Sequence, residues 1–153
     1  MRTALLAILG LFTLLGVGCD KSITENDIEF ASLAEVKQLV DASKSAPKAT
    51  LIVDPRSESA YAAGRIPGAV NIALPSIRED DDPDPAITAY AQIVVYGDNP
   101  ASPPARAMTK RLLAAGYKET RLFAGGLEEW KSAQFPIETG PPTHSLPPRR
   151  RLR

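Results

Sequence analysis

Few residues in this 153-residue chain can act as nucleophiles, general bases or soft metal ligands. Cys19 is its single cysteine and His144 its single histidine. This count excludes an intrachain disulfide, a dithiol redox pair and a zinc site built from these two residue types. His144 lies in a terminal stretch rich in proline and arginine, so a Ser-His-Asp arrangement has no ordered base. Cys19 is therefore the only residue that could carry out cysteine chemistry. Its position in the sequence indicates a role other than catalysis.

Cys19 follows an uncharged hydrophobic run, residues 4–17, which comes after a short positive start. A membrane-spanning helix needs about 20 apolar residues, so this shorter run predicts a signal peptide over residues 1–18. Residues 15–19, Leu-Gly-Val-Gly-Cys, resemble the lipobox of bacterial lipoproteins, with Gly16 where that motif usually has leucine. The resemblance implies an exported lipoprotein, anchored to a membrane through a lipid on Cys19 and facing the periplasm or the cell exterior. Ordinary secretory cleavage, which leaves a soluble protein, is the alternative.

Composition and charge narrow the classes of function. Hydrophobic residues make up 44% of the chain and charged residues 24%, which is typical of a folded protein and excludes a wholly disordered one. The formal net charge is 0, but residues 20–140 carry −5 because five arginines and no acids lie outside them. A mildly acidic body argues against a nucleic-acid partner bound through a basic field.

Alternating strand and helix patterns predict the fold class. Ile28 and Phe30 alternate with acids as in a half-buried strand, and Ser32 with Glu35 forms a capping box for the next helix. Further strands are expected at 51–53, 69–73, 93–96 and 120–123, and further helices at 57–63 and 106–115. Such alternation is typical of parallel strands joined by right-handed helical crossovers. The sequence therefore predicts a single α/β domain with a central parallel β-sheet and helices on both faces.

Short segments flank this domain, which is expected over residues 27–139. Residues 19–26 begin with the cysteine and continue as a polar tether. Residues 140–153 contain a run of prolines and arginines and predict a disordered tail. Residues 78–85, Arg-Glu-Asp-Asp-Asp-Pro-Asp-Pro, are expected to form a solvated loop. No metal is expected there, because the spaced ligands and turn glycine of a carboxylate site are missing.

A charged corner and a Pro-Gly turn lie between the strands expected at 51–53 and 69–73. Asp54 and Arg56 suit a local ion pair that fixes the corner, which is a structural role, and the later turn returns the chain to the sheet. The motif residues are Asp54, Arg56, Gly64, Pro67 and Gly68. This segment resembles the rhodanese-like family, which has Asp-x-Arg after its second strand and Gly-His-Ile-Pro-Gly-Ala before its third. Arg65 stands here in place of that histidine.

The second half of the chain extends the resemblance. The apolar strand at 93–96 resembles the one that enters the family's active-site loop, and residues 106–117 resemble the helix that follows it. Gly125, Gly126 and Trp130 match the Leu-x-Gly-Gly-x-x-x-Trp ending, in which the tryptophan is a core residue. The resemblance covers about residues 27–139 and implies the family's α/β fold.

The resemblance also implies a sulfur chemistry for which this chain lacks the residue. In active members the strand runs straight into a cysteine, whose thiolate takes a sulfane sulfur from thiosulfate and is held by loop amides and a helix N-terminus. Gly97 occupies that position, so no catalytic residue is expected. The active-site-like loop consists of Gly97, Asp98, Asn99, Pro100, Ala101, Ser102, Pro103 and Pro104.

Other residues of this loop point away from anion chemistry. Its three prolines lack N–H groups, and Asp98 places a negative charge where an anion would bind. Ser102, which precedes Pro103, is expected to cap the next helix rather than act as a nucleophile. Arg106, on the first turn of that helix, is expected to be a solvated side chain, and acceptance of an anion at the loop is the alternative.

These observations favour a non-catalytic rhodanese-like domain, exported and lipid-anchored, that acts as a binding or scaffold module. Its expected partners are the membrane, through Cys19, and a protein at the loop 97–104, with no cofactor and no nucleic acid. The alternative is a rhodanese-type sulfurtransferase that uses an unrecognised group or a thiol supplied by a partner.

Overall fold

The computed structural model describes residues 22–79 and 82–141. Within them, five strands form one parallel sheet in the order β1-β5-β4-β2-β3. The strands are β1 Glu29–Phe30, β2 Thr50–Asp54, β3 Val70–Asn71, β4 Gln92–Tyr96 and β5 Thr120–Phe123. The helices are α1 Leu33–Ser43, α2 Glu58–Ala63, α3 Pro85–Thr88, α4 Pro103–Ala114 and α5 Gly126–Ser132, with 3-10 turns η1 Glu25–Asp27 and η2 Leu74–Ser76.

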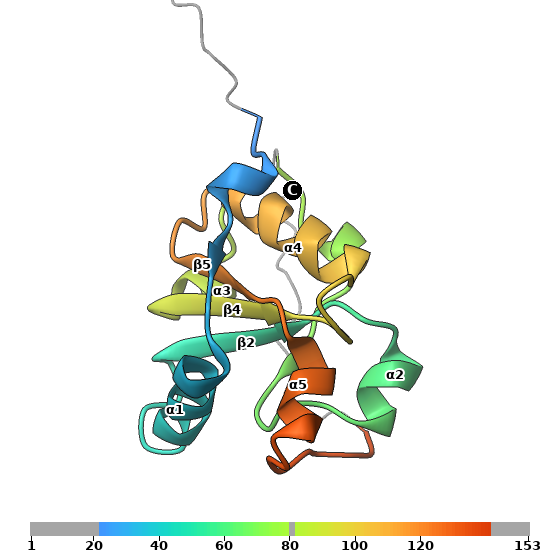
Figure 1. Cartoon of the computed structure of the whole chain (residues 1–153). Coiled ribbons are helices and arrows are strands. Elements are labelled where there is room, and N and C mark those ends of the chain that lie inside the picture. The colour runs from blue at the N-terminus through green and yellow to red at the C-terminus, as the bar shows by residue number, and fades with distance from the viewer. Residues whose placement is uncertain (1–21, 80–81, 142–153) are drawn as a thin grey trace, which may run out of the picture.

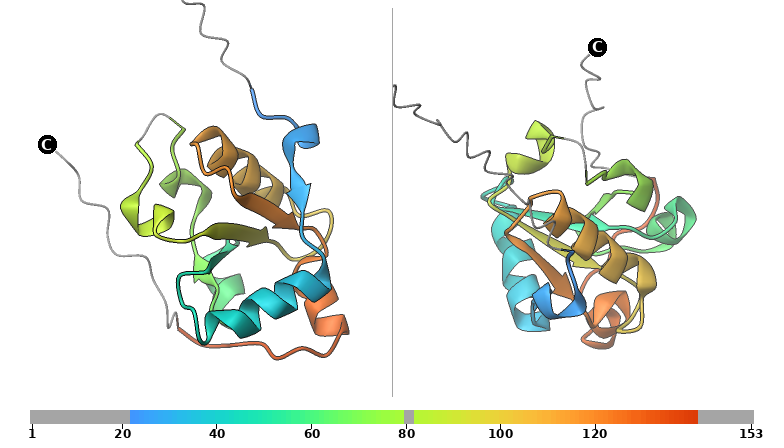
Figure 2. Two further views of the ribbon diagram at one scale, coloured as in Figure 1. Left: turned by 90° about the vertical axis from the view of Figure 1, so that its left-hand side faces the viewer. Right: turned by 90° about the horizontal axis from the view of Figure 1, so that it is seen from above.

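Helices cover both faces of this sheet. In Figure 1, α4 lies on one side of the strands, and α1 and α5 lie on the other. Figure 2 shows the same arrangement from two further directions. Buried side chains of α3 and α4, with the partly buried Leu74 of η2, contact one face, and buried side chains of α1, α2 and α5 contact the opposite face. The predicted α/β class, with a central parallel sheet between helices, is therefore confirmed.

The central strands β2 and β4 are buried on both sides, as their uninterrupted apolar runs indicate. Val53 and Val95 belong to the core cluster under α4, whereas Ile52 and Val94 belong to the cluster under α1 and α5. Each such side chain, fully removed from water, contributes about 1.5–3 kcal/mol to folding. The two clusters hold β2 and β4 rigidly, and the loops at the carboxyl ends of these strands form the candidate site.

Helix α1 begins with the capping box that the sequence predicts. The Ser32 hydroxyl accepts from the amide of Glu35 at 3.3 Å, and the Glu35 carboxylate accepts from the amide of Ser32 at 2.8 Å. These hydrogen bonds lower the pKa of Glu35. The helix start is thus determined by two residues three positions apart, which is why it can be located from sequence.

Three elements differ from the sequence expectation. Strand β3 spans only Val70–Asn71 rather than 69–73, because it lies at the sheet edge and pairs with β2 alone. Helix α4 begins at Pro103 rather than at 106, since proline is tolerated in a first helical turn, where its missing N–H is not needed. Helix α5 was not expected at all, because its first residue is a glycine.

The acidic segment 78–85 was expected to be a solvated loop, and part of it is ordered by a helix. Asp84 accepts from the amide of Ala86 at 2.9 Å and so caps α3, whose first residue is Pro85. Residues 80 and 81 lie outside the described residues. A proline that follows a capping aspartate therefore starts a short helix here instead of extending the loop.

The segment expected to be a polar tether joins the fold before its predicted end. Thr24 and Asp27 cap the turn η1, and Glu25 forms ion pairs with Arg106 at 3.0 Å and Lys110 at 2.9 Å on α4. Residues 24–26 therefore lie against the domain, because Glu25 pairs with two basic residues of α4. The sequence pattern could not predict that these residues lie close together.

The C-terminal segment is fastened by a buried arginine. Arg65, with a side chain 1% exposed, pairs with Glu138 at 3.2 Å and donates to the carbonyl of Gly140 at 2.8 Å. Its guanidinium lies 4.5 Å from the ring centroid of Tyr61. The first residues of the expected tail, Gly140 and Pro141, are thus bound to the domain, and residues 142–153 lie outside the described residues.

The export segment cannot be placed in this fold. The expected signal peptide and Cys19 lie outside the described residues. Among residues 22–79 and 82–141, no helix has both the length and the apolar character needed to cross a membrane.

Candidate functional site

A buried ion pair occupies the end of β2. Arg56 donates to both carboxylate oxygens of Asp54, with its Nε 2.9 Å from Oδ1 and its Nη2 2.6 Å from Oδ2. The Asp54 side chain is fully buried and the Arg56 side chain is 5% exposed. The carbonyl of Gly64, at the end of α2, accepts a further hydrogen bond from Nη2 at 2.7 Å. The expected ion pair between Asp54 and Arg56 is formed, and its arginine also binds the end of α2.

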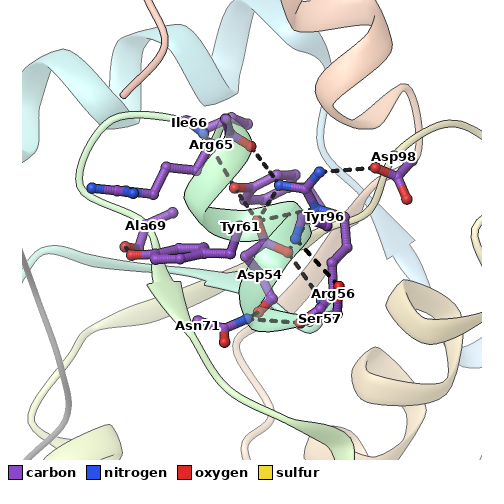
Figure 3. A network of polar contacts seen from close by, with 12 residues as sticks. Asp54, Arg56, Ser57, Tyr61, Arg65, Ile66, Ala69, Asn71, Tyr96 and Asp98 are labelled. Carbon is purple, nitrogen blue, oxygen red and sulfur yellow. Dashed lines mark hydrogen bonds and ion pairs between the residues drawn. The ribbon is translucent and has the colours of Figure 1, made fainter. Parts of the chain in front are cut away.

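Two further side chains complete this polar network, which Figure 3 shows. The phenol of Tyr96, at the end of β4, donates to Asp54 Oδ2 at 2.6 Å and accepts from the amide of Ile66 at 3.2 Å. Asn71 donates to the carbonyls of Asp54 and Arg56, both at 2.8 Å. Every fully buried polar side-chain atom in the described residues has a hydrogen-bond partner, so the network is complete.

The pKa values of the network agree with its geometry. Burial, together with the negative charge of Asp54, raises the pKa of Tyr96 well above its usual range. Burial opposes the charge on Arg56, but its hydrogen bonds to Asp54 raise the pKa of the guanidinium. Near neutral pH the guanidinium is therefore charged and the phenol is protonated.

Asp98 connects this network to the loop that follows β4. Arg56 Nη1 lies 2.8 Å from Asp98 Oδ1, and the Asp98 side chain is 63% exposed. Asp98 was expected only as a negative charge beside the position of Gly97. The structure shows that its carboxylate is also held in place by an arginine 42 residues away in the sequence.

Gly97 follows β4, and there is no space around its Cα for a side chain. The side chain of Ser102 fills the volume in which a Cβ at position 97 would lie, and Ala105 Cβ would lie 3.1 Å from that Cβ. The loop has curled so that its sixth residue occupies the place of its first side chain. A larger residue at 97 is therefore incompatible with the present position of Ser102.

Ser102 lies at the N-cap position of α4, as expected, but the hydrogen bond expected of a cap is absent. Its side chain accepts no amide hydrogen bond from the helix. The hydroxyl is instead directed toward the position that a Cβ on Gly97 would occupy. The prediction of the position was correct and the prediction of its capping role was wrong.

The loop uses its own amides internally. The Asn99 side chain accepts from the amide of Ala101 at 3.0 Å, and the Asn99 carbonyl accepts from the amide of Ser102 at 3.0 Å. With three prolines that lack N–H groups, five of the eight loop residues therefore offer no amide to a ligand. An anion would find few donors here.

Gly126 allows this loop to lie against α5. Its φ is +62°, and a Cβ on it would lie 2.5 Å from the carbonyl oxygen of Gly97. The carbonyls of Gly97 and Asp98 accept from the amides of Leu127 and Glu128, both at 2.8 Å, and so satisfy the first amides of α5. The Gly-Gly motif thus fastens the loop to a helix start that would otherwise be uncapped.

The remaining motif residues shape the surroundings of the site. Gly68 has a φ of +76° in the turn after Pro67, a conformation that favours glycine. Trp130 is fully buried, as expected of a core residue, and donates from its indole to the carbonyl of Pro136 at 2.7 Å. Gly125 precedes α5, and the Glu129 side chain lies where its Cβ would be.

Arg106 is not the free, solvated side chain that the sequence suggested. It pairs with Glu25 at 3.0 Å and donates to the carbonyl of Pro100 at 3.3 Å. Both contacts hold the guanidinium in place beside Pro100 of the loop. Glu25 was not identified from sequence, since only the fold brings residues 81 positions apart together.

The sequence did not lead us to expect that Tyr96 contacts the ion pair of Asp54 and Arg56. The signal was available, because a hydroxyl-bearing residue at the carboxyl end of a fully apolar strand must find a partner when buried. Pairing between β2 and β4 then brings that partner to Asp54.

Replacement of Arg56 by methionine is predicted to destabilise the domain strongly. Arg56→Met leaves Asp54 buried without a counter-charge, so the free energy of unfolding should fall by about 3–5 kcal/mol in urea titrations. The control is Lys44→Met, which removes an exposed ion pair with Asp41 and should change stability by less than about 1 kcal/mol. Equal effects of the two variants would contradict a structural role for the buried pair.

A matched pair of glycine variants tests the contact between the loop and α5. Gly116 also has a positive φ, +88°, but nothing lies within 4 Å of its Cβ position. Gly116→Ala should therefore cost only backbone strain of about 1–2 kcal/mol. Gly126→Ala should cost about 1–3 kcal/mol more because it also overlaps the loop backbone. Urea titrations measure both, and an equal loss would show that the loop does not press on Gly126.

Comparisons with known proteins agree with this fold. The family described as Rhodanese-like domain matches residues 32–133. A search of curated proteins found no match. A Bacillus halodurans protein of known structure shares 23% identity, with a TM-score of 0.56 over 72% of this chain and 77% of its own.

Two further solved structures are similar in fold. A Rhodopseudomonas palustris protein, described as a possible tyrosine phosphatase, is 24% identical, with a TM-score of 0.59 over 74% of this chain and 86% of its own. A thiosulfate sulfurtransferase from Pseudomonas aeruginosa is 19% identical, with a TM-score of 0.61 over 82% of this chain but 23% of its own. Since the family match spans about two thirds of the sequence and the sheet is that of these structures, this chain belongs to the rhodanese-like domain family.

Proposed function

We propose that this protein is a non-catalytic rhodanese-like domain, exported and lipid-anchored through Cys19, that binds a partner protein through the loop 97–104. The observation that carries the proposal is the packing at Gly97. The residue has no side chain, and Ser102 fills the space that a nucleophile at that position would need. The thiolate chemistry that the family resemblance implies therefore lacks both a sulfur atom at position 97 and the space for one.

The surrounding loop supports the same proposal. Few of its amides are available to a transferred anionic group, and Asp98 presents a carboxylate beside the position where such a group would sit. Its exposed surface is made of small apolar and proline residues around that carboxylate. Such a surface suits contact with another polypeptide better than turnover of a small anion.

Cys19 is a poor substitute for the missing thiol. If it is lipidated, its sulfur is a thioether and cannot form a persulfide. If it is free, it lies eight positions before residue 27, where the domain is expected to begin, and no group near it is known to lower its pKa. The alternative, a sulfurtransferase that borrows a thiol from a partner, needs the loop to accept a persulfide, and its few free donors argue against that.

Activity and thiol reactivity together test the proposal. Purified mature protein should show no turnover of thiosulfate and cyanide, and turnover that survives Cys19→Ser would overturn the proposal. In a Cys19→Ser background, Gly97→Cys alone should be destabilised by about 1–3 kcal/mol through overlap with Ser102. Adding Ser102→Gly should recover that stability and yield a thiol that iodoacetamide alkylates, whereas equal stability with and without Ser102→Gly would contradict the packing argument.

Mass spectrometry of the mature N-terminus tests the anchor. The expected mass is that of a chain beginning at Cys19 with acyl chains attached, because the lipobox-like sequence places the cysteine first after cleavage. Protein expressed with Cys19→Ser is the control and should be found in the soluble fraction. An unmodified thiol on wild-type Cys19 would refute lipidation and leave the soluble alternative.

A further inference from the structure

We infer that the loop 97–104 recognises a cationic side chain, a lysine or arginine presented by an extended segment of a partner protein. The inference rests on the proposed function and names the chemistry of its partner. Its basis is the loop at the carboxyl end of β4. The family resemblance implies that this loop binds an anion, but here it offers few amide donors and carries a carboxylate.

Hydrogen-bond donors are scarce at this surface. Three of the eight loop residues are prolines, and two more direct their amides at Asn99. The first two residues of α4 are Pro103 and Pro104, so this helix start lacks two of the amides that normally attract negative charge. The carbonyls of Gly97, Asp98, Asn99 and Pro100 already accept hydrogen bonds, so the acceptors that remain are the side-chain oxygens of Asp98 and Ser102.

Asp98 is the first of these acceptors. One of its carboxylate oxygens, Oδ1, is held by Arg56, and Figure 3 shows the other oxygen turned away from that guanidinium. Asp54 already neutralises Arg56, so the trio of Asp54, Arg56 and Asp98 has one net negative charge. That charge resides at its exposed end, because the Asp98 side chain is 63% exposed while that of Asp54 is fully buried. Asp98 is thus a fixed carboxylate that shares a single arginine with Asp54.

Ser102 is the second acceptor. The residue is 7% exposed, its hydroxyl does not cap α4, and no described group bonds to it. Because the described residues contain no fully buried polar side-chain atom without a partner, this oxygen must reach solvent. The hydroxyl of Ser102, which can donate as well as accept, is therefore available to accept a hydrogen bond from a ligand placed beside Asp98.

Neighbouring charges have the same sign. The amide of Glu128 donates to the carbonyl of Asp98, which places the acids of the first α5 turn, Glu128 and Glu129, beside the loop. Both residues are exposed. Two cations lie nearby, but Arg106 is engaged by Glu25, and Lys131 lies against Gly64. The acids outnumber the cations, and the field at the loop favours a positive ligand.

The occupant is a polypeptide rather than a metal ion or a small cation. Among residues 22–79 and 82–141, no three acidic, histidine or cysteine side chains are grouped to hold a metal. Ser102 fills the interior of the loop, so a ligand must lie on its surface. There the exposed Pro100, Ala101 and Pro103 offer apolar contact around one carboxylate, an arrangement that suits an arginine or lysine with its aliphatic stem.

Peptide titrations of the full mature chain, followed by amide chemical shifts in NMR, test this inference. A capped pentapeptide of alanines with a central arginine should shift the amides of Asp98, Asn99 and Ser102. The same peptide with citrulline, which is neutral and nearly identical in shape, should bind about ten-fold more weakly. Asp98→Asn, which keeps a hydrogen-bond acceptor for Arg56, should weaken arginine-peptide binding by a similar factor.

The matched control is Glu119→Gln, an exposed acid just before β5 and so at the opposite end of the strands from the loop. It should leave the arginine-peptide affinity unchanged. Equal binding of the arginine and citrulline peptides, or tighter binding of thiosulfate or of a glutamate peptide, would overturn the inference. Such a result would leave the proposed non-catalytic function standing, because that depends on the activity measurement and not on the sign of the ligand.

Discussion

The ion pair between Asp54 and Arg56 is the interaction on which the candidate site depends. Two charges removed from water are stable only if every donor and acceptor is satisfied, and here the further partners come from three other segments of the chain. Tyr96 brings β4 to the pair, Gly64 brings the end of α2, and Asp98 brings the loop. Because the guanidinium has a rigid geometry, it fixes these elements relative to one another and holds the loop without a ligand.

Within that frame, positions 97 and 102 share a single side-chain volume. One of them can carry a side chain that points into the loop, and in this chain it is the second. Gly97, which follows β4, therefore has no open space for a larger side chain, because Ser102 fills that volume. A substitution that places a thiol at position 97 would meet a steric conflict with Ser102.

Local patterns predicted much of the fold, and tertiary contacts account for what they missed. The capping box of Ser32 and Glu35 and the apolar run of β2 depend on neighbouring residues, so their positions follow from sequence. Helix α5 was missed because its first amides are satisfied by carbonyls of Gly97 and Asp98, a cap supplied from about 30 residues away. The contact between Asp98 and Arg56 also joins residues that lie far apart in the sequence. The charge of Asp98 could therefore be predicted from sequence, but its partner could not.

The sign of the ligand that a loop prefers depends on its backbone as much as on its charged side chains. An amide donor removed by proline cannot face an anion, and an amide that bonds to Asn99 is already used. The carbonyls of Gly97 and Asp98 are satisfied by amides of α5, so the loop keeps its shape through its own backbone and that helix. Arg56 is shared between Asp54 and Asp98, so these three side chains carry one net negative charge at the carboxyl end of β4. The proposed preference for a positive ligand therefore depends on the backbone and on these charges together.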